Sequence, residues 1–176
     1  VKNGEDHNFY VATVSGAGVN TWSAQVTGTS GVSPDEATAL YVDGSSNVIA
    51  TGFVKDSAES YNFCTAKFNN IGLLQWLTKF NYGNGSDKAV ALGVDGNGNI
   101  YVAGRCDADS SDAVTDYDFG VVKYNSSGAE QWAKLQGTAG NAEEPVAIAV
   151  SSAGNVYVTG RSTVGTNDDV YTAKFN

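Results

Sequence analysis

The sequence has few of the residues on which common catalytic and redox centres depend. Among its 176 residues there are two cysteines, two prolines, one histidine and no methionine. Cys64 and Cys106 lack the close spacing of a metal or redox motif, so we expect two free thiols packed as small hydrophobes, with a disulfide between them as the alternative. His7 lies near a chain end, and no serine-nucleophile elbow, phosphate-binding loop or zinc ligand set is present. The sequence predicts a protein that is not an enzyme, although its many carboxylates leave an acid/base glycosidase or lyase open.

Basic residues and long apolar runs are also scarce. The sequence has 10 Lys and Arg residues and 19 Asp and Glu residues, which gives a net charge of −9. A field of this sign repels phosphate backbones and anionic lipid surfaces, so we predict no nucleic-acid partner and no membrane insertion. No apolar run approaches the ~20 residues that span a bilayer, and there is no signal peptide pattern. Because the chain begins at Val1 and contains no methionine, we expect position 1 not to be a translation start.

What the sequence does contain is an internal repeat of about 55 residues. One block, which ends at Trp22, Trp76 and Trp132, aligns without a gap, and two further blocks recur with similar steps. The three sets read FYVATVSGAGVNTW, FCTAKFNNIGLLQW and FGVVKYNSSGAEQW; NVIATG, NIYVAG and NVYVTG; and DEATALYVD, DKAVALGVD and EEPVAIAVS. A fourth copy of the first block begins at VYTAKFN, where the chain ends.

Each repeat predicts four short strands and no helix. The runs ATALYVD, AVALGVD and VAIAVS are almost unbroken apolar segments of strand length, which indicates a first strand buried on both faces. Turns rich in Gly and Asn lead to the second strand, and a third strand precedes the strand that carries the tryptophan. Four antiparallel strands every ~50 residues predict an all-β fold, a β-propeller built from four-stranded antiparallel blades, with a solenoid as the alternative. The strictly periodic tryptophans are expected to pack between blades rather than to stack on sugars.

We interpret residues 1–176 as a single array of such repeats. It consists of two strands at 8–27, a blade at 36–80, a blade at 88–137 and three strands at 144–176. Closed propellers have 4 to 8 blades, so about three blades are expected to be incomplete on their own. We therefore expect either a piece of a longer propeller or an assembly in which subunits complete each other through open strand edges, as a ring or a filament.

The quoted blocks resemble the beta-propeller repeat (SBBP) that bacterial surface and secreted proteins carry in tandem. SSAGNVYVTGRS and DGNGNIYVAGR match its first block, and NFCTAKFNNIG, DFGVVKYNSSG and VYTAKFN match its second. The first copy departs most, because Thr13 stands where Lys67, Lys123 and Lys174 stand in the others. The resemblance covers nearly the whole chain. It implies a propeller fold and an extracellular or cell-surface location, and it implies no activity, because the repeat is a scaffold without shared catalytic residues.

The predicted strand order places the short, stereotyped turns at one end of the array and the longer links at the other. These links, such as VKDSAES, CDADSSDAVTDY and STVGTNDD, differ between copies, and variable loops on a rigid scaffold are where recognition usually lies. We therefore predict a ligand-binding face at this end. Its candidate residues are Asp35, Asp87 and Glu143, which recur at one aligned position, together with Asp112 and Asp116. The alternative is that the recurring three fix the turn into the first strand.

Closely spaced carboxylates also suggest calcium, which prefers several oxygen ligands. Asp107 and Asp109 are the candidate ligands, but the segment lacks the Gly and the distal Glu of an EF-hand loop, and a solvated acidic loop is the alternative. The run DGNGN from Asp95 is better explained by turn chemistry, and no other cofactor is predicted. The sequence thus predicts a non-catalytic extracellular or cell-surface scaffold that binds copies of itself or another protein. A carbohydrate-binding, lectin-like propeller that uses the variable-loop face is the alternative.

Overall fold

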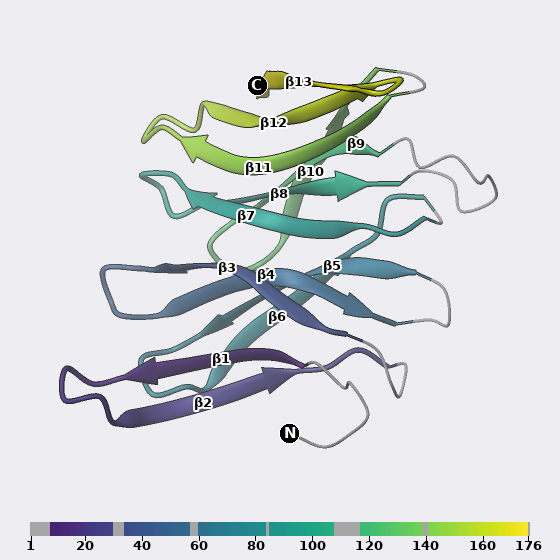
Figure 1. Cartoon of the computed structure of the whole chain (residues 1–176). Helices are drawn as coiled ribbons and strands as arrows, with labels where there is room; N and C mark the ends of the chain where they lie inside the picture. The colour runs from purple at the N-terminus through teal and green to yellow at the C-terminus, as the bar shows by residue number, and fades with distance from the viewer. Residues whose placement is uncertain are drawn as a thin grey trace.

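The computed structural model describes residues 8–29, 34–56, 60–83, 85–107, 117–138 and 141–175. These residues form thirteen β-strands and no helix, arranged as four antiparallel sheets that lie side by side in one array (Figure 1). No helix that could span a membrane occurs among them. The fold is therefore all-β and built from blade-like sheets, as the repeat predicted, and the sheets do not close into a ring.

Chain order and sheet order follow each other throughout the array. The first blade contains β1 (Phe9–Val14) and β2 (Asn20–Val26); the second contains β3 (Glu36–Val42), β4 (Val48–Lys55), β5 (Tyr61–Phe68) and β6 (Leu74–Phe80); the third contains β7 (Lys88–Val94), β8 (Ile100–Cys106), β9 (Asp118–Tyr124) and β10 (Glu130–Gln136); the fourth contains β11 (Ala142–Val150), β12 (Val156–Val164) and β13 (Asn167–Phe175). The strands β3, β7 and β11 lie beside one another along the inner edge, and β1 and β13 lie at opposite ends of the array (Figure 1).

Local side-chain hydrogen bonds explain the tight turns at one end of the blades. Between β7 and β8, Asp95 Oδ1 accepts the amides of Asn97 and Asn99, at 2.8 Å and 3.0 Å. Asp43 accepts the equivalent pair of amides between β3 and β4. Each turn then needs one residue with positive φ, which Gly98 adopts at 78°. The run from Asp95 is thus a turn, as predicted.

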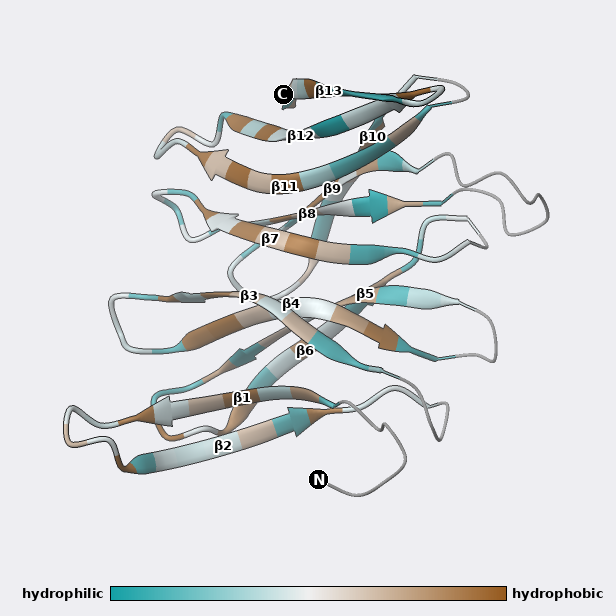
Figure 2. Ribbon diagram, viewed as in Figure 1, coloured by the Kyte–Doolittle hydropathy of each residue, from teal (hydrophilic) through white to brown (hydrophobic). Residues whose placement is uncertain are grey.

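The hydrophobic core lies between the blades. Between the first and second blades, Phe9 and Val11 of β1 belong to one buried cluster with Cys64, Ala66 and Phe68 of β5. Two equivalent clusters fill the next two interfaces, and apolar residues accordingly run along strands such as β7 (Figure 2). Three layers of apolar contacts therefore hold four thin sheets together.

The tryptophans belong to these interfaces, as predicted. Trp22 contacts Phe68 of the next blade at 5.9 Å between ring centroids. Its indole also lies over Gly72, where a Cβ atom would come within 2.8 Å of the ring. Trp76 lies over Gly128 of the third blade in the same way. Each of these indoles therefore covers a glycine turn of the following blade.

The prediction that the first strand of each repeat is buried on both faces is wrong. Leu40 of β3 is 62% exposed, and only the middle strands, such as β4 and β8, are buried along nearly their whole length. The reason is the position of the inner strand: it pairs with a neighbour on one side only, and its other side lies open at the inner edge. Its apolar residues therefore contact the neighbouring inner strands without being completely buried.

The predicted division into two ends agrees with the structure except at one link. β4 ends and β5 begins at the end opposite the tight turns, and β8 ends and β9 begins at the same end (Figure 1). The segment STVGTNDD, expected to be a long variable link, instead continues β12 and β13 up to a turn at Gly165 and Thr166. Pairing of Val164 with Asn167 extends the hairpin, so this link presents almost no loop.

Candidate functional site

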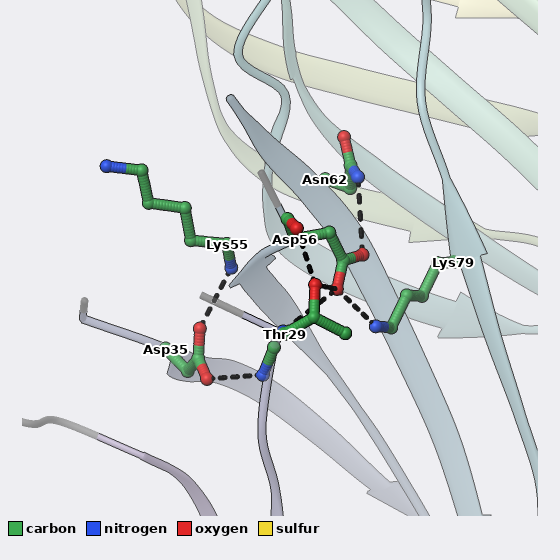
Figure 3. Close-up of polar contacts among 7 residues, drawn as sticks. Thr29, Asp35, Lys55, Asp56, Asn62 and Lys79 are labelled. Carbon is green, nitrogen blue, oxygen red and sulfur yellow. Dashed lines mark hydrogen bonds and ion pairs between the residues drawn. The ribbon is translucent and has the colours of Figure 1, made fainter. Parts of the chain in front are cut away.

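A buried carboxylate stands where each inner strand begins. Asp35 accepts the amide of Gly28 at 2.6 Å and the amide of Lys55 at 2.9 Å (Figure 3). Gly28 belongs to the link from the first blade, and Lys55 ends β4. The carboxylate therefore ties the incoming link to the second strand of its own blade.

The next junction repeats this arrangement. Asp87 accepts the amides of Tyr82 at 2.6 Å and Asp107 at 3.1 Å, and its own amide donates to the carbonyl of Tyr61. Asp87 is completely buried. Burial outweighs the stabilising effect of the two amides and raises the pKa of this carboxyl to about 7. The junction thus contains a carboxyl group that titrates near neutral pH.

The third junction differs because its residue is longer by one methylene group. Glu143 Oε1 accepts the hydroxyl of Ser162 at 2.8 Å, and Glu143 Oε2 is buried with no hydrogen-bond partner among the described residues. The Glu143 amide still donates to the carbonyl of Tyr117, as the Asp87 amide does to Tyr61. The backbone arrangement therefore repeats even though the side-chain contacts do not.

These contacts bear on the predicted ligand-binding face without testing it. The oxygens of Asp35 and Asp87 point at backbone amides, which is the geometry expected if they fix the turn into the inner strand. Asp109, Asp112 and Asp116 lie outside the described residues. A calcium site at Asp107 and Asp109 stays a prediction, and within the described ranges no group of three or more His, Cys, Asp or Glu residues gathers as a metal site.

A second set of polar contacts joins the first two blades at the same end. Asp56, directly after β4, accepts the amide of Thr29 at 3.3 Å and pairs with the Lys79 ammonium at 2.6 Å (Figure 3). Asn62 also donates to this carboxylate. Burial alone would raise the pKa of Asp56, but the hydrogen bond and the charge of Lys79 outweigh it and hold the pKa low. Asp56 therefore remains ionised where it connects the first two blades.

The third blade contributes basic residues to the same end, which the sequence reasoning missed. Lys88 begins β7 and Arg105 lies near the end of β8, directly opposite it in the strand register. They line a cavity of about 270 Å³ together with Phe53, Val90, Glu144 and Pro145. The repeat alignment could have revealed this difference. The residue after each recurring carboxylate is acidic in two copies and basic in the third: Glu36, Glu144 and Lys88.

Comparison with protein families agrees with this architecture. The model of the beta-propeller repeat SBBP matches residues 75–109 and 131–167. The chain carries SBBP beta-propeller repeats. Each matched segment runs from the outer strand of one blade through the first two strands of the next, so it spans a carboxylate junction. A comparison with curated proteins gives no match.

Other recurring residues of the SBBP repeat have structural roles in the described part of the chain. Lys67 pairs with the carboxylate of Asp43 at 3.1 Å. Lys123 instead lies over the ring of Tyr101 at 5.2 Å. Cys64 and Cys106 are buried free thiols in different clusters, and burial raises the pKa of Cys64 to about 12. The prediction of two free thiols is confirmed.

Proposed function

We propose that this chain is a non-catalytic β-propeller scaffold, extracellular or at the cell surface, whose end blades bind further blades. The partner we propose is a second copy of the chain, which docks head to tail. The observation that carries this proposal is the exposure, at both ends of the array, of repeat positions that are buried inside it.

One of these surfaces is the outer face of the fourth blade. Val170 is 88% exposed, whereas Phe119, which holds the same repeat position in the third blade, is completely buried. Tyr157 is 45% exposed, although its equivalent Tyr101 is buried against the fourth blade. These positions of the fourth blade thus present the apolar surface that every preceding blade covers with its successor.

The outer face of the first blade is the complementary surface. Tyr10 is 49% exposed and Val14 is 62% exposed, while their equivalents Cys64 and Phe68 are buried against the preceding blade. The two outer faces therefore correspond to the two halves of one interface that already occurs three times within the array. Because they differ, their contact is head to tail and gives either a ring or a filament.

Open strand edges support the same proposal. β13 pairs with β12 only, so its other edge presents unpaired backbone groups among the described residues. Such an edge can accept a strand from another chain. The location outside the cell rests on the resemblance to repeats of secreted and surface proteins, and fractionation of producing cells tests it: a purely cytoplasmic chain would contradict it.

Light scattering on the 176-residue chain tests the assembly. We expect a mass that rises with protein concentration, because burying the two outer faces removes apolar surface from water. Val14→Lys and Val170→Lys each place a charge in one face and should abolish the association. The matched control is Val19→Lys, which changes a residue that is also 62% exposed but lies in the β1–β2 turn. A folded monomer at all concentrations, or equal loss of association in the control, would refute the proposal.

A further inference from the structure

The third blade departs from the repeat at one pair of facing positions. In the fourth blade the pair is Glu144 and Arg161, which form an ion pair at 2.7 Å. In the second blade it is Glu36 and Phe53. In the third blade it is Lys88 and Arg105, so two cations face each other across adjacent strands. Like charges in directly opposite positions destabilise a sheet, and a local departure of this kind calls for another explanation than stability.

Aromatic rings, rather than a carboxylate, surround the ammonium group of Lys88. Its Nζ lies 4.6 Å from the ring centroid of Phe53 and 4.2 Å from that of Tyr61. Among the described residues, no carboxylate forms an ion pair with it. Burial and the neighbouring charge of Arg105 lower the pKa of Lys88, against the opposing effect of Glu36. Lys88 is thus a cation held by aromatic rings, with no paired carboxylate among the described residues.

Arg105 is fixed in place from two sides. Its guanidinium lies 4.5 Å from the ring centroid of Tyr117, and its Nη1 pairs with Glu144 at 3.3 Å. A guanidinium has five N–H donors, so this contact with Glu144 leaves donors for a further acceptor. The planar fork of these donors matches a carboxylate. Lys88 and Arg105 therefore offer an ammonium and part of a guanidinium to one site.

Both cations line the cavity of about 270 Å³ at the inner edge of the array, and residues from three blades contribute to its wall. Phe53 comes from the second blade, and Pro145 and Glu144 come from the fourth. Val90 and Pro145 add apolar surface beside the charged groups. A site with a few convergent polar groups and apolar walls is typical of small-ligand binding, and this volume suits a small molecule.

We propose that the cavity at Lys88 and Arg105 binds the carboxylate group of a small organic acid. The ammonium and the guanidinium hold the carboxylate oxygens, and the apolar wall contacts the body of the ligand. The net charge of −9 repels large polyanions from the chain as a whole, which favours a small monoanion or dianion. This site does not depend on the assembly proposed above, because all its residues belong to one chain.

Titration of the 176-residue chain with three probes, followed by ¹H–¹⁵N NMR, tests the site. D-glucuronate and succinate carry carboxylates on a sugar body and on a simple chain, and glucose is the neutral reference. We expect saturable shifts of Lys88 and Arg105 amides with at least one acid and none with glucose. Binding of glucuronate alone identifies a sugar acid, and binding of both identifies the carboxylate as the recognised group.

Substitutions make the test specific. Lys88→Glu restores the acidic residue of the other two copies, so this variant should fold at least as well as the parent chain. Its affinity for the acid should fall at least ~10-fold, the loss expected for one charge-assisted contact. Lys174→Gln is the control, because Lys174 also lies over a tyrosine ring, that of Tyr157, but does not line the cavity. The proposal would be overturned if neither acid binds, if glucose binds as well as the acids, or if the affinity for the acid is unchanged in Lys88→Glu. It would also be overturned if sodium chloride at the same concentration produces the same NMR shifts as the acids.

Discussion

At the scale of single residues, the blade junctions depend on carboxyl groups that are removed from water. Asp87 receives two backbone amides, which compensate for its burial only in part, and its pKa is raised to about 7. Asp95, in a tight turn, shows the opposite balance. Burial would raise its pKa, but amide and side-chain donors from Asn97 and Asn99 outweigh burial and lower it. Similar side chains therefore respond differently to pH according to their position in the repeat.

The raised pKa of Asp87 predicts a loss of stability as pH rises from about 4 to 7. In this range the folded state binds the proton more strongly than the unfolded state, so the protonated form favours folding at low pH, and this contribution is lost as pH approaches the folded pKa. The free energy of unfolding, relative to Asp87→Asn, should fall by on the order of 3 kcal/mol across the window. Urea unfolding at a series of pH values measures it.

Asp95→Asn is the control for this pH dependence. Because the pKa of Asp95 is lowered, its stabilising effect is complete above the unfolded value near 3.8 and is lost only below it. The difference between the parent chain and Asp95→Asn should therefore be flat from pH 5 to 7. A flat profile for Asp87→Asn as well would show that the Asp87 carboxyl is not perturbed.

Trp76 carries a second prediction at this scale. Its indole covers the turn at Gly128, and its Nε1 donates to the carbonyl of Ser126 at 3.3 Å. Trp76→Ala should lower the free energy of unfolding by about 3 kcal/mol, the lower part of the range for large aromatic residues, because the side chain is only half-buried. Gln75→Ala, at the exposed neighbouring position, should change it by less than about 0.5 kcal/mol. Chemical denaturation compares the two variants. Equal losses of stability would show that the tryptophan does not pack at the interface between blades.

At the scale of elements, the hairpin turns combine backbone conformation with packing between blades. Gly18 and Gly128 occupy the same turn position in different blades, with φ of 79° and 83°. A Cβ atom at Gly18 would meet open space, whereas one at Gly128 would lie 2.6 Å from the ring of Trp76. The same element thus tolerates a side chain in the first blade, where no earlier blade is described, and excludes it in the third.

This contrast predicts two different costs for one substitution. Gly18→Ala should cost about 1 kcal/mol, from the left-handed backbone alone. Gly128→Ala should cost about 2–4 kcal/mol, because displacement of the indole adds to that strain. Thermal and urea unfolding of the two variants gives the comparison. Similar costs would mean that the tryptophan moves away from the turn without penalty.

The elements also show which parts of the fold were predictable. Turns and strands follow from local patterns, so the repeat located the hairpins and the middle strands correctly. The exposure of Leu40 and the short turn at Gly165 depend on what surrounds a strand, which no local pattern contains. The pairing of Lys88 with Arg105 depends on a register shift between Ala89 and Ala91, so the sequence alone could not place these two cations opposite each other.

At the scale of the whole molecule, the array is a series of nearly identical interfaces with two unmatched ends. Val170 is the repeat equivalent of Phe119, and Val14 is the repeat equivalent of Phe68. Both phenylalanines are buried inside the array, whereas both valines are exposed. Stability in such a series comes mainly from contacts between neighbours. We therefore expect the outer face of the fourth blade to bind the outer face of the first blade of another copy.

Mixing two disabled variants tests this claim most directly. Val14→Lys retains an intact fourth-blade face, and Val170→Lys retains an intact first-blade face, so each alone should be a monomer. Mixed in equal amounts, they should form a 1:1 dimer that grows no further, because only one intact pair of faces remains. Light scattering measures the mass. A mixture that stays monomeric while the parent chain associates would contradict the head-to-tail contact, and so would either variant that self-associates like the parent chain.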